Sequence, residues 1–216
     1  MTHYTFPLMG LSRHRLGTDG QGVTTLVAAW GCTLRCRMCL NHQCWDRDVT
    51  VREVTAEDLY RITKVDDLYF QATHGGVTFG GGEPLQHAEF MQEFRQIVGT
   101  RWKVLAETSL NVPEEKVKTA IRCVDEFMVD IKDMNPDIYR SYTGMDNHRM
   151  ISNLQKLLQC AGGDHVLVRV PYIPGYNSEE DVYKSVQQLK TMGVERFDVF
   201  VYRQIKTRLS TVTDPQ

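Results

Sequence analysis

The sequence predicts an α/β protein built as an incomplete, TIM-like (β/α)6 barrel of parallel strands. Six short apolar runs alternate with amphipathic segments between about residue 23 and residue 202. The runs are rich in Val and Phe and mostly apolar on both faces, as buried parallel strands tend to be. An eight-strand barrel typically needs about 250 residues, whereas this chain has 216. We therefore expect an incomplete barrel rather than a flat, doubly wound sheet.

The predicted strands are Val23–Trp30, Gly76–Phe79, Trp102–Glu107, Glu126–Lys132, His165–Val170 and Phe197–Tyr202. Residues 1–22 are expected to form a lead-in that ends in a tight turn, and residues 207–216 a polar tail. No stretch rich in Pro, Gly or Ser interrupts the alternation, so we expect residues 1–216 to form a single domain.

Helical patterns fill the gaps between these strands. Thr55-Ala-Glu-Asp58 reads as a capping box that opens the first helix. Apolar residues recur at helical spacing from Phe90 to Val98, and Pro113 stands at the first turn of a helix over 114–124. Two further helices are expected over 147–160 and 178–192, the last with Ser178 as its N-cap.

Composition and charge exclude several classes of function. Lys and Arg number 25 and Asp and Glu 27, which gives a net charge of −2 at pH 7. Without a basic block, this balance argues against a nucleic-acid-binding domain. No apolar stretch is long enough to cross a bilayer, and the N-terminus does not resemble a signal peptide. We therefore expect a soluble, cytoplasmic protein with no nucleic-acid or membrane partner.

The cysteines point to a metal centre. Four of the six lie within residues 32–44, and such clustering in an intracellular chain favours metal binding over disulfides. Cys32, Cys36 and Cys39 form a C-x3-C-x2-C run after the first strand. Four-iron clusters normally take four cysteines, so three would leave one iron open to a substrate or cofactor. The alternatives are a zinc site completed by His42 or Cys44, and three buried thiols.

Polar or metal-binding residues also follow every other predicted strand. They are the Gly80–Pro84 turn, Glu107 to Ser109, Asp130 with Lys132, Arg169 with Pro171, and Tyr202 with Arg203. The carboxyl ends of parallel strands meet at one rim, which is where α/β folds place their chemistry. The sequence therefore predicts one site that combines these residues with the cysteine run.

Two features of this rim allow both a binding role and a structural one. Glycines in the Gly80–Glu83 turn would let the backbone approach a ligand, and Glu83 adds an acceptor suited to an ammonium group, although a plain tight turn is the alternative. Asp130 ends an apolar strand, and burying a carboxylate without a partner costs roughly several kcal/mol, so we expect it to be paired. The partner is a ligand in the functional interpretation, and Lys132 or a helix N-terminus in the structural one.

Together these motifs resemble the radical S-adenosylmethionine (radical SAM) superfamily, and within it the pyruvate formate-lyase activating enzymes. The resemblance covers nearly the whole chain. Its motifs are Gly17–Gly22, Gly31-Cys-Thr-Leu-Arg-Cys-Arg-Met-Cys-Leu-Asn41, Trp45-Asp46, Gly75-Gly-Val-Thr-Phe-Gly-Gly-Gly-Glu-Pro84, Asp130-Ile-Lys132, Asn147-His-Arg149 and Val170–Tyr176.

The resemblance implies one [4Fe–4S] cluster held by Cys32, Cys36 and Cys39, with SAM bound to the fourth iron. It also implies that Gly81, Gly82 and Glu83 hold the amine of SAM. Asp130 and Lys132 would engage the rest of SAM. From its place at the end of the fifth predicted strand, we expect Arg169 to take part in cofactor binding as well.

The chain departs from the family pattern at several positions. Leu40 replaces an aromatic or His side chain, and Arg203 stands where His is expected. We expect Arg203 to contact SAM or the substrate, or to pair with Asp130 or Glu107; a solvated surface arginine is the alternative. Glu107 replaces an Asp that, with Thr108 and the Met128 backbone, resembles a monovalent-cation site. The remaining cysteines are too dispersed for a ferredoxin-like insert, so a single cluster is expected.

The activity implied by the resemblance is reductive cleavage of SAM. A flavodoxin- or ferredoxin-type donor would reduce the cluster, and the resulting 5′-deoxyadenosyl radical would take a hydrogen atom from the substrate. In an activase that substrate is a glycine of a partner glycyl-radical enzyme, whose loop could enter through the open side of the barrel. The alternatives are a radical SAM enzyme that modifies a peptide or small molecule, and a zinc-stabilised binding module.

Overall fold

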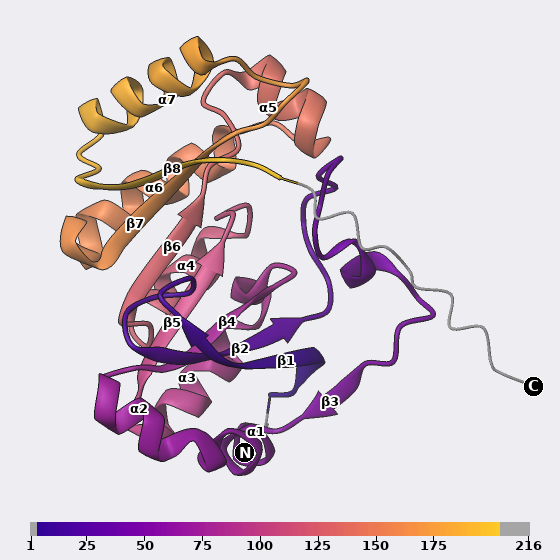
Figure 1. Cartoon of the computed structure of the whole chain (residues 1–216), viewed down its shortest axis with the longest axis vertical. Coiled ribbons are helices and arrows are strands. Elements are labelled where there is room, and N and C mark those ends of the chain that lie inside the picture. The colour runs from indigo at the N-terminus through magenta and orange to yellow at the C-terminus, as the bar shows by residue number, and fades with distance from the viewer. Residues whose placement is uncertain (1–3, 204–216) are drawn as a thin grey trace, which may run out of the picture.

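The computed structural model describes residues 4–203, which contain one eight-stranded sheet in the order β3-β1-β2-β4-β5-β6-β7-β8 (Figure 1). Six of these strands run parallel: β2 (Val23–Ala29), β4 (Gly76–Gly81), β5 (Lys103–Thr108), β6 (Glu126–Asp130), β7 (Val166–Tyr172) and β8 (Arg196–Val201). They correspond to the six predicted strands. Because β3 and β8 are free edges, the sheet is not closed, and the predicted incomplete barrel is confirmed.

Two antiparallel strands were not predicted. β1 (Phe6–Leu16) pairs with β2, and β3 (Arg52–Val54) pairs with β1. The expectation that residues 1–22 form a lead-in before the first strand was therefore wrong. The second half of β1 is mostly exposed and carries His and Arg, so it lacks the apolar run that identified the other strands.

Seven α-helices lie along the described chain: α1 (Ala56–Thr63), α2 (Asp67–Thr73), α3 (Ala88–Val98), α4 (Glu114–Ile121), α5 (Pro136–Thr143), α6 (His148–Ala161) and α7 (Glu179–Thr191). The predicted capping box of Thr55 and Asp58 is present, and Ser178 caps α7. α2 and α5 were not predicted. None of the described helices is long and apolar enough to cross a membrane.

The hydrophobic core lies between the helices and one face of the sheet. Phe79 of β4 packs against Phe90 and Phe94 of α3, with ring centroids 6.3 and 5.6 Å apart. Val104 of β5 and Phe127 of β6 are fully buried in the same cluster. Because side chains alternate along a strand, the residues between these core positions face the other side of the sheet.

That other face of the sheet is partly covered by the turn between β1 and β2. The Thr78 hydroxyl donates to the backbone carbonyl of Asp19 at 2.8 Å. Gly20 lies against Leu105 so closely that a Cβ atom there would come 2.2 Å from its Cδ2 atom. The turn therefore closes the half of this face that lies away from the carboxyl ends of the strands.

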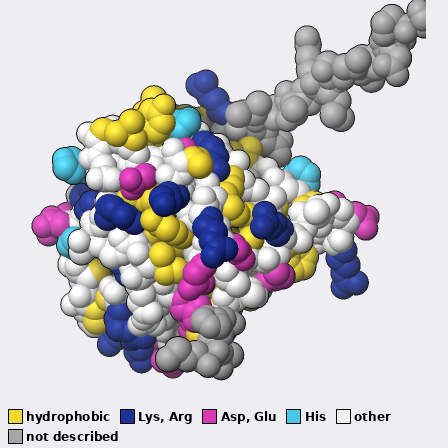
Figure 2. All heavy atoms as spheres, turned by 90° about the horizontal axis from the view of Figure 1, so that it is seen from below, with side chains coloured by type: hydrophobic (Ala, Val, Ile, Leu, Met, Phe, Trp, Pro, Cys, Tyr) yellow, Lys and Arg dark blue, Asp and Glu magenta, His cyan; other side chains and the backbone are white. Residues whose placement is uncertain are grey.

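Seen from below, the surface mixes both signs of charge with hydrophobic side chains (Figure 2). This mixture agrees with the small net charge of the chain.

Candidate functional site

Cys32, Cys36 and Cys39 lie on the loop after β2, which we call the cysteine loop (residues 31–39). Their thiols are free and partly buried. A hydrogen bond from the buried Cys44 lowers the pKa of Cys32, and lowers the pKa of Cys39 to about 6. Burial raises the pKa of Cys36 to about 11, although Lys132 opposes the rise. The loop thus offers three soft sulfur ligands, two of them with lowered pKa, which suits an iron–sulfur cluster.

No group of three or more His, Cys, Asp or Glu side chains within residues 4–203 is close enough to hold one metal ion.

The cysteine loop is fastened to distant parts of the fold. The backbone N–H of Arg35 donates to the carbonyl of Thr143, the last residue of α5, at 2.9 Å. The Tyr202 hydroxyl, just after β8, donates to the carbonyl of Met38. α5 and the end of β8 therefore fix the loop above the carboxyl ends of the strands.

The glycine turn after β4 packs directly against the start of this loop. The Glu83 N–H donates to the carbonyl of Gly31 at 2.8 Å, and the Asn41 amide donates to the carbonyl of Gly81 at 3.1 Å. A Cβ atom on Gly82 would lie 2.0 Å from the Gly31 oxygen. Gly82 is thus required for this close approach of the two segments.

The side chain of Glu83 points into the protein. It is 1% exposed. Burial raises the pKa of Glu83, whereas the hydrogen bonds from Ser109 and Thr108 lower it by less. One carboxylate oxygen accepts from the Thr108 hydroxyl at 2.7 Å and from the Leu85 N–H at 3.2 Å. The other accepts from the Ser109 hydroxyl at 2.6 Å and N–H at 2.9 Å. Every one of these donors belongs to the chain itself.

Charged side chains gather beside the glycine turn, on the face of the sheet opposite the helices, which we call the inner face. Arg169 of β7 donates to Glu107 of β5 at 2.7 Å, and its Nε atom lies 3.9 Å from Asp130 and 3.8 Å from Asp198. Burial raises the pKa of Glu107 to about 7, although Arg169 opposes the rise. Asp198 was not predicted, because it lies in the middle of β8 rather than at its end.

Lys132 joins this charged group to the cysteine loop. Its Nζ atom lies 3.5 Å from an Asp130 oxygen. Burial acts to lower the pKa of Lys132, but Asp130 and Cys36 outweigh it and the pKa is raised. The structure thus pairs Asp130 with Lys132, and the charges of Lys132 and Cys36 influence each other's pKa.

Arg15 and Asp19 lie below this group and were missed as site residues. Their side chains form a bidentate ion pair, with Nη2 and Oδ1 2.9 Å apart, and Asp19 is 1% exposed. Both charges influence the pKa of Glu107. The motif around Asp19 was noticed in the sequence, but only the fold places it beneath Glu107.

Arg203 and Thr108 are two further residues that the sequence predicted at the site. Arg203 is exposed, and the two carboxylates it was expected to reach, Asp130 and Glu107, contact Arg169 instead. The Thr108 hydroxyl is occupied by Glu83 and by the Leu110 N–H. Glu107 is paired to Arg169, and the monovalent-cation site expected at Glu107, Thr108 and the Met128 backbone stays a prediction.

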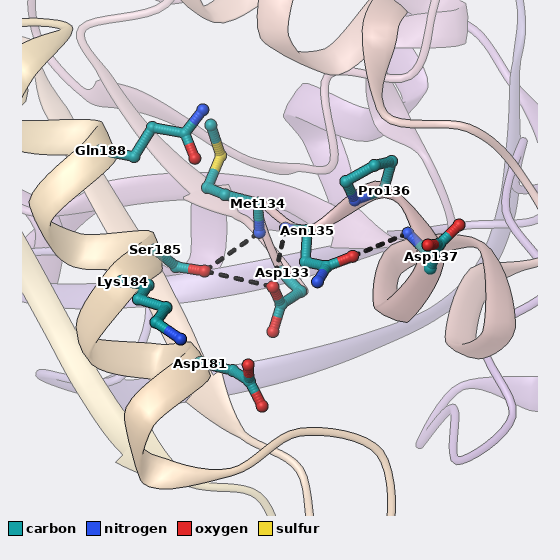
Figure 3. Close-up of a pocket in the computed structure, with 9 residues that line it drawn as sticks. All are labelled: Asp133, Met134, Asn135, Pro136, Asp137, Asp181, Lys184, Ser185 and Gln188. Atoms are coloured by element: carbon teal, nitrogen blue, oxygen red, sulfur yellow. Dashed lines mark hydrogen bonds between the residues drawn. The ribbon is translucent and has the colours of Figure 1, made fainter.

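A separate polar pocket of about 440 Å³ lies between the segment after β6 and α7 (Figure 3). Its centre is the buried carboxylate of Asp133, which accepts hydrogen bonds from the Ser185 hydroxyl at 3.2 Å and the Asn135 N–H at 2.8 Å. Asp133 thus points toward α7, whereas its neighbour Lys132 pairs with Asp130 on the inner face. The pocket is not part of the rim that carries the cysteine loop.

Comparisons with known proteins identify a family that matches most of the chain. The family model of the radical SAM superfamily matches residues 29–188. The pyruvate formate-lyase 1-activating enzyme of Escherichia coli (strain K12) is 28% identical over 192 residues, which cover 87% of this chain and 77% of that enzyme. The pyruvate formate-lyase-activating enzyme of Staphylococcus aureus (strain USA300) is 28% identical, with 88% and 79% covered. The (2S)-3-sulfopropanediol dehydratase activating enzyme of Klebsiella oxytoca is 33% identical over 62% of this chain and 41% of that enzyme.

Solved structures share the fold at low sequence identity. Streptococcus suis SuiB bound to S-adenosylmethionine superposes with a TM-score of 0.64 at 15% identity, covering 84% of this chain and 41% of SuiB. Native anSMEcpe with bound AdoMet has a TM-score of 0.57 at 18% identity, covering 81% and 50%. The chain therefore spans half or less of these two proteins.

Proposed function

The chain belongs to the radical SAM superfamily, and from this premise we propose that it activates a glycyl-radical enzyme by taking a hydrogen atom from a glycine of that partner. One observation supports the proposal above the others. The cysteine loop, the glycine turn and the group formed by Asp130, Lys132 and Arg169 converge on one rim of an open sheet. Superfamily membership implies a [4Fe–4S] cluster and SAM, and that rim has ligands suited to both.

Cys32, Cys36 and Cys39 would hold the cluster. Their loop is tied to α5 through Arg35 and Thr143, so its position does not depend on the cluster alone. The positive charge of Lys132 close to Cys36 would offset part of the negative charge that three thiolates bring. When bound, the reduced cluster and SAM would supply a 5′-deoxyadenosyl radical.

SAM carries a sulfonium and an ammonium group, and the inner face of the sheet suits them. Glu107, Asp130 and Asp198 surround the single guanidinium of Arg169. With Lys132 included, these carboxylates outnumber the cationic groups when Glu107 is ionised, which favours a cationic ligand. Asp130 is the best placed to contact SAM, since its side chain is 29% exposed and adjoins both Lys132 and Arg169.

The activase role rests on two further supports. The E. coli and S. aureus relatives that match most of this chain are activating enzymes. The sheet also ends at the free edge of β8, whose Val199 and Val201 are more than half exposed. That open side would let a peptide loop approach the rim, whereas a closed barrel would admit only small molecules.

The test is anaerobic reconstitution with iron and sulfide, followed by addition of SAM, a flavodoxin- or ferredoxin-type donor and a glycyl-radical enzyme from the same genome. We expect 5′-deoxyadenosine and a glycyl-radical electron paramagnetic resonance signal on the partner. Cleavage of SAM without that signal for any such partner would favour a radical SAM enzyme acting on another peptide or small molecule. The zinc-stabilised binding module considered from the sequence is set aside by the family match.

A further inference from the structure

The carboxylate of Glu83 has no acceptor position left for a ligand. A carboxylate offers about four lone-pair sites, and Glu83 accepts four hydrogen bonds, from the hydroxyls of Thr108 and Ser109 and the backbone N–H groups of Leu85 and Ser109. It is also 1% exposed. An ammonium group could reach it only if one of these bonds broke and the side chain turned outward.

The bonds of Glu83 join three consecutive strand ends. Glu83 follows β4, and its backbone N–H donates to the carbonyl of Gly31, just after β2. Its side chain accepts hydrogen bonds from Thr108 and Ser109 at the end of β5. These are the strand ends that carry the cysteine loop, the glycine turn and Glu107. Fixing Glu83 therefore fixes the relative positions of all three.

We infer that Ser109 is a positioning residue that, together with Glu83, forms a latch across the rim. This inference rests on the proposed function for the identity of the ligand. Glu83 acts on SAM through this latch, by holding the glycine turn and the end of β5 in place, and not as an acceptor for the amine. Ser109 supplies two of the four donors and so contributes most to the latch.

The test is a double-mutant cycle with Ser109→Ala, Glu83→Gln and the double variant. Ser109→Ala removes one donor and is mild enough to fold, while Glu83→Gln presents an amide N–H₂ to groups that are themselves donors. Ser185→Ala is the matched control. Its hydroxyl is also buried and donates to another buried carboxylate, Asp133, at 3.2 Å, outside the rim.

Two quantities are measured for each variant. In the cluster-free chain, Ser109→Ala and Ser185→Ala should each lower the midpoint temperature of thermal unfolding by about 3–8 °C. Equilibrium dialysis of SAM against the reconstituted protein should show that Ser109→Ala lowers the affinity for SAM about 5- to 20-fold. Ser185→Ala should leave this affinity unchanged. In the double variant, both effects should be no larger than those of Glu83→Gln alone, because the residues act as a unit.

A direct contact between Glu83 and SAM gives the opposite pattern. Ser109→Ala would then bind SAM like the parent, and the latch would be overturned. Fold-changes in SAM affinity that multiply in the double variant would overturn it as well. A parent chain that binds no SAM would contradict the proposed function and with it the ligand role. Coupled unfolding shifts in the cluster-free chain would still show whether the latch exists.

Discussion

Arg169 on β7 reaches across β6 to donate a 2.7 Å hydrogen bond to Glu107 on β5. The two strands are not neighbours, because β6 pairs with both of them. The bond therefore crosses the face of β6, and Asp130 of this intervening strand lies 3.9 Å from the same guanidinium. This arrangement places a cation among carboxylates at the centre of the candidate site.

Glu107 should make the protein less stable as pH rises toward neutrality. Burial raises its pKa to about 7 in the folded chain, whereas an unfolded Glu titrates near about 4.3. Between these values the folded chain keeps a proton that the unfolded chain has lost. The contribution of Glu107 to the free energy of unfolding is thus fully present below about pH 4.3 and lost by about pH 7.

Glu107→Gln should remove this fall, which amounts to at most about 4 kcal/mol. The measurement is urea unfolding of the cluster-free chain at pH values from about 5 to about 8. Glu115→Gln, on the exposed face of α4, is the control and should follow the parent. A constant difference between parent and Glu107→Gln across this range would show that Glu107 titrates normally.

Only the three cysteines of the cysteine loop should be needed to bind the cluster. Replacing any of them by Ala is expected to abolish cluster iron, because no other thiol lies on that loop. Iron and sulfide are measured after anaerobic reconstitution. Chains with Ala at the buried Cys44, at Cys123 against α4 or at the exposed Cys160 should keep their iron. Loss of iron in the Cys123 variant, with retention in the Cys36 variant, would contradict the assignment.

The parallel part of the fold could be predicted from the sequence because each of its strands carries a short apolar run, and most of these strands are buried. β6 reads as a continuous apolar run, and its core residues Phe127 and Val129 are fully buried. β1 was not found in this way, since Pro7 and Gly10 interrupt its apolar first half and its second half is polar and mostly exposed. α5 did offer a signal, because Asn135 caps it and Pro136 occupies its first position.

The residue types at the rim could also be predicted, but not the orientation of their side chains. Carboxyl ends of parallel strands lie on one edge of the sheet, so Asp130 and the cysteine loop were expected on the same rim. The sequence cannot tell whether Glu83 points toward a ligand or into the protein, since that depends on the donors its neighbours offer. In the same way, the sequence could not tell that Arg169, which is in register with Asp130, is the arginine that pairs with Glu107.

Asp130→Asn should weaken SAM binding and leave cluster iron unchanged. The substitution removes the negative charge beside Lys132 and Arg169, and loss of one charge-assisted hydrogen bond lowers affinity about ten- to a hundredfold. Equilibrium dialysis of SAM measures the change. Asp137→Asn, exposed at the start of α5, is the control. Parent-like affinity in Asp130→Asn would remove Asp130 from the SAM site.

Arg203→Ala should lower the rate of SAM cleavage or of hydrogen abstraction without altering cluster iron. The reason is its place just after Tyr202, whose hydroxyl contacts the cysteine loop at Met38. An always-charged guanidinium at this exposed position can meet SAM or the substrate. The rates of 5′-deoxyadenosine formation and of substrate modification decide the matter. If both match the parent, Arg203 is a surface residue.

Gly82→Ala should displace the cysteine loop from the rim. A Cβ atom at this position would lie 2.0 Å from the Gly31 oxygen and 2.9 Å from the Ala29 oxygen. Both are backbone atoms, so relief requires the end of β2 to move, at a cost of about 1–3 kcal/mol in stability. Because Cys32 directly follows Gly31, we expect less cluster iron as well as a lower unfolding temperature. Gly10→Ala on β1 is the control, since a Cβ atom there meets no atom within 4 Å. It should leave both quantities unchanged, and a Gly82→Ala chain that behaves like it would mean that the loop and the glycine turn are not held in contact.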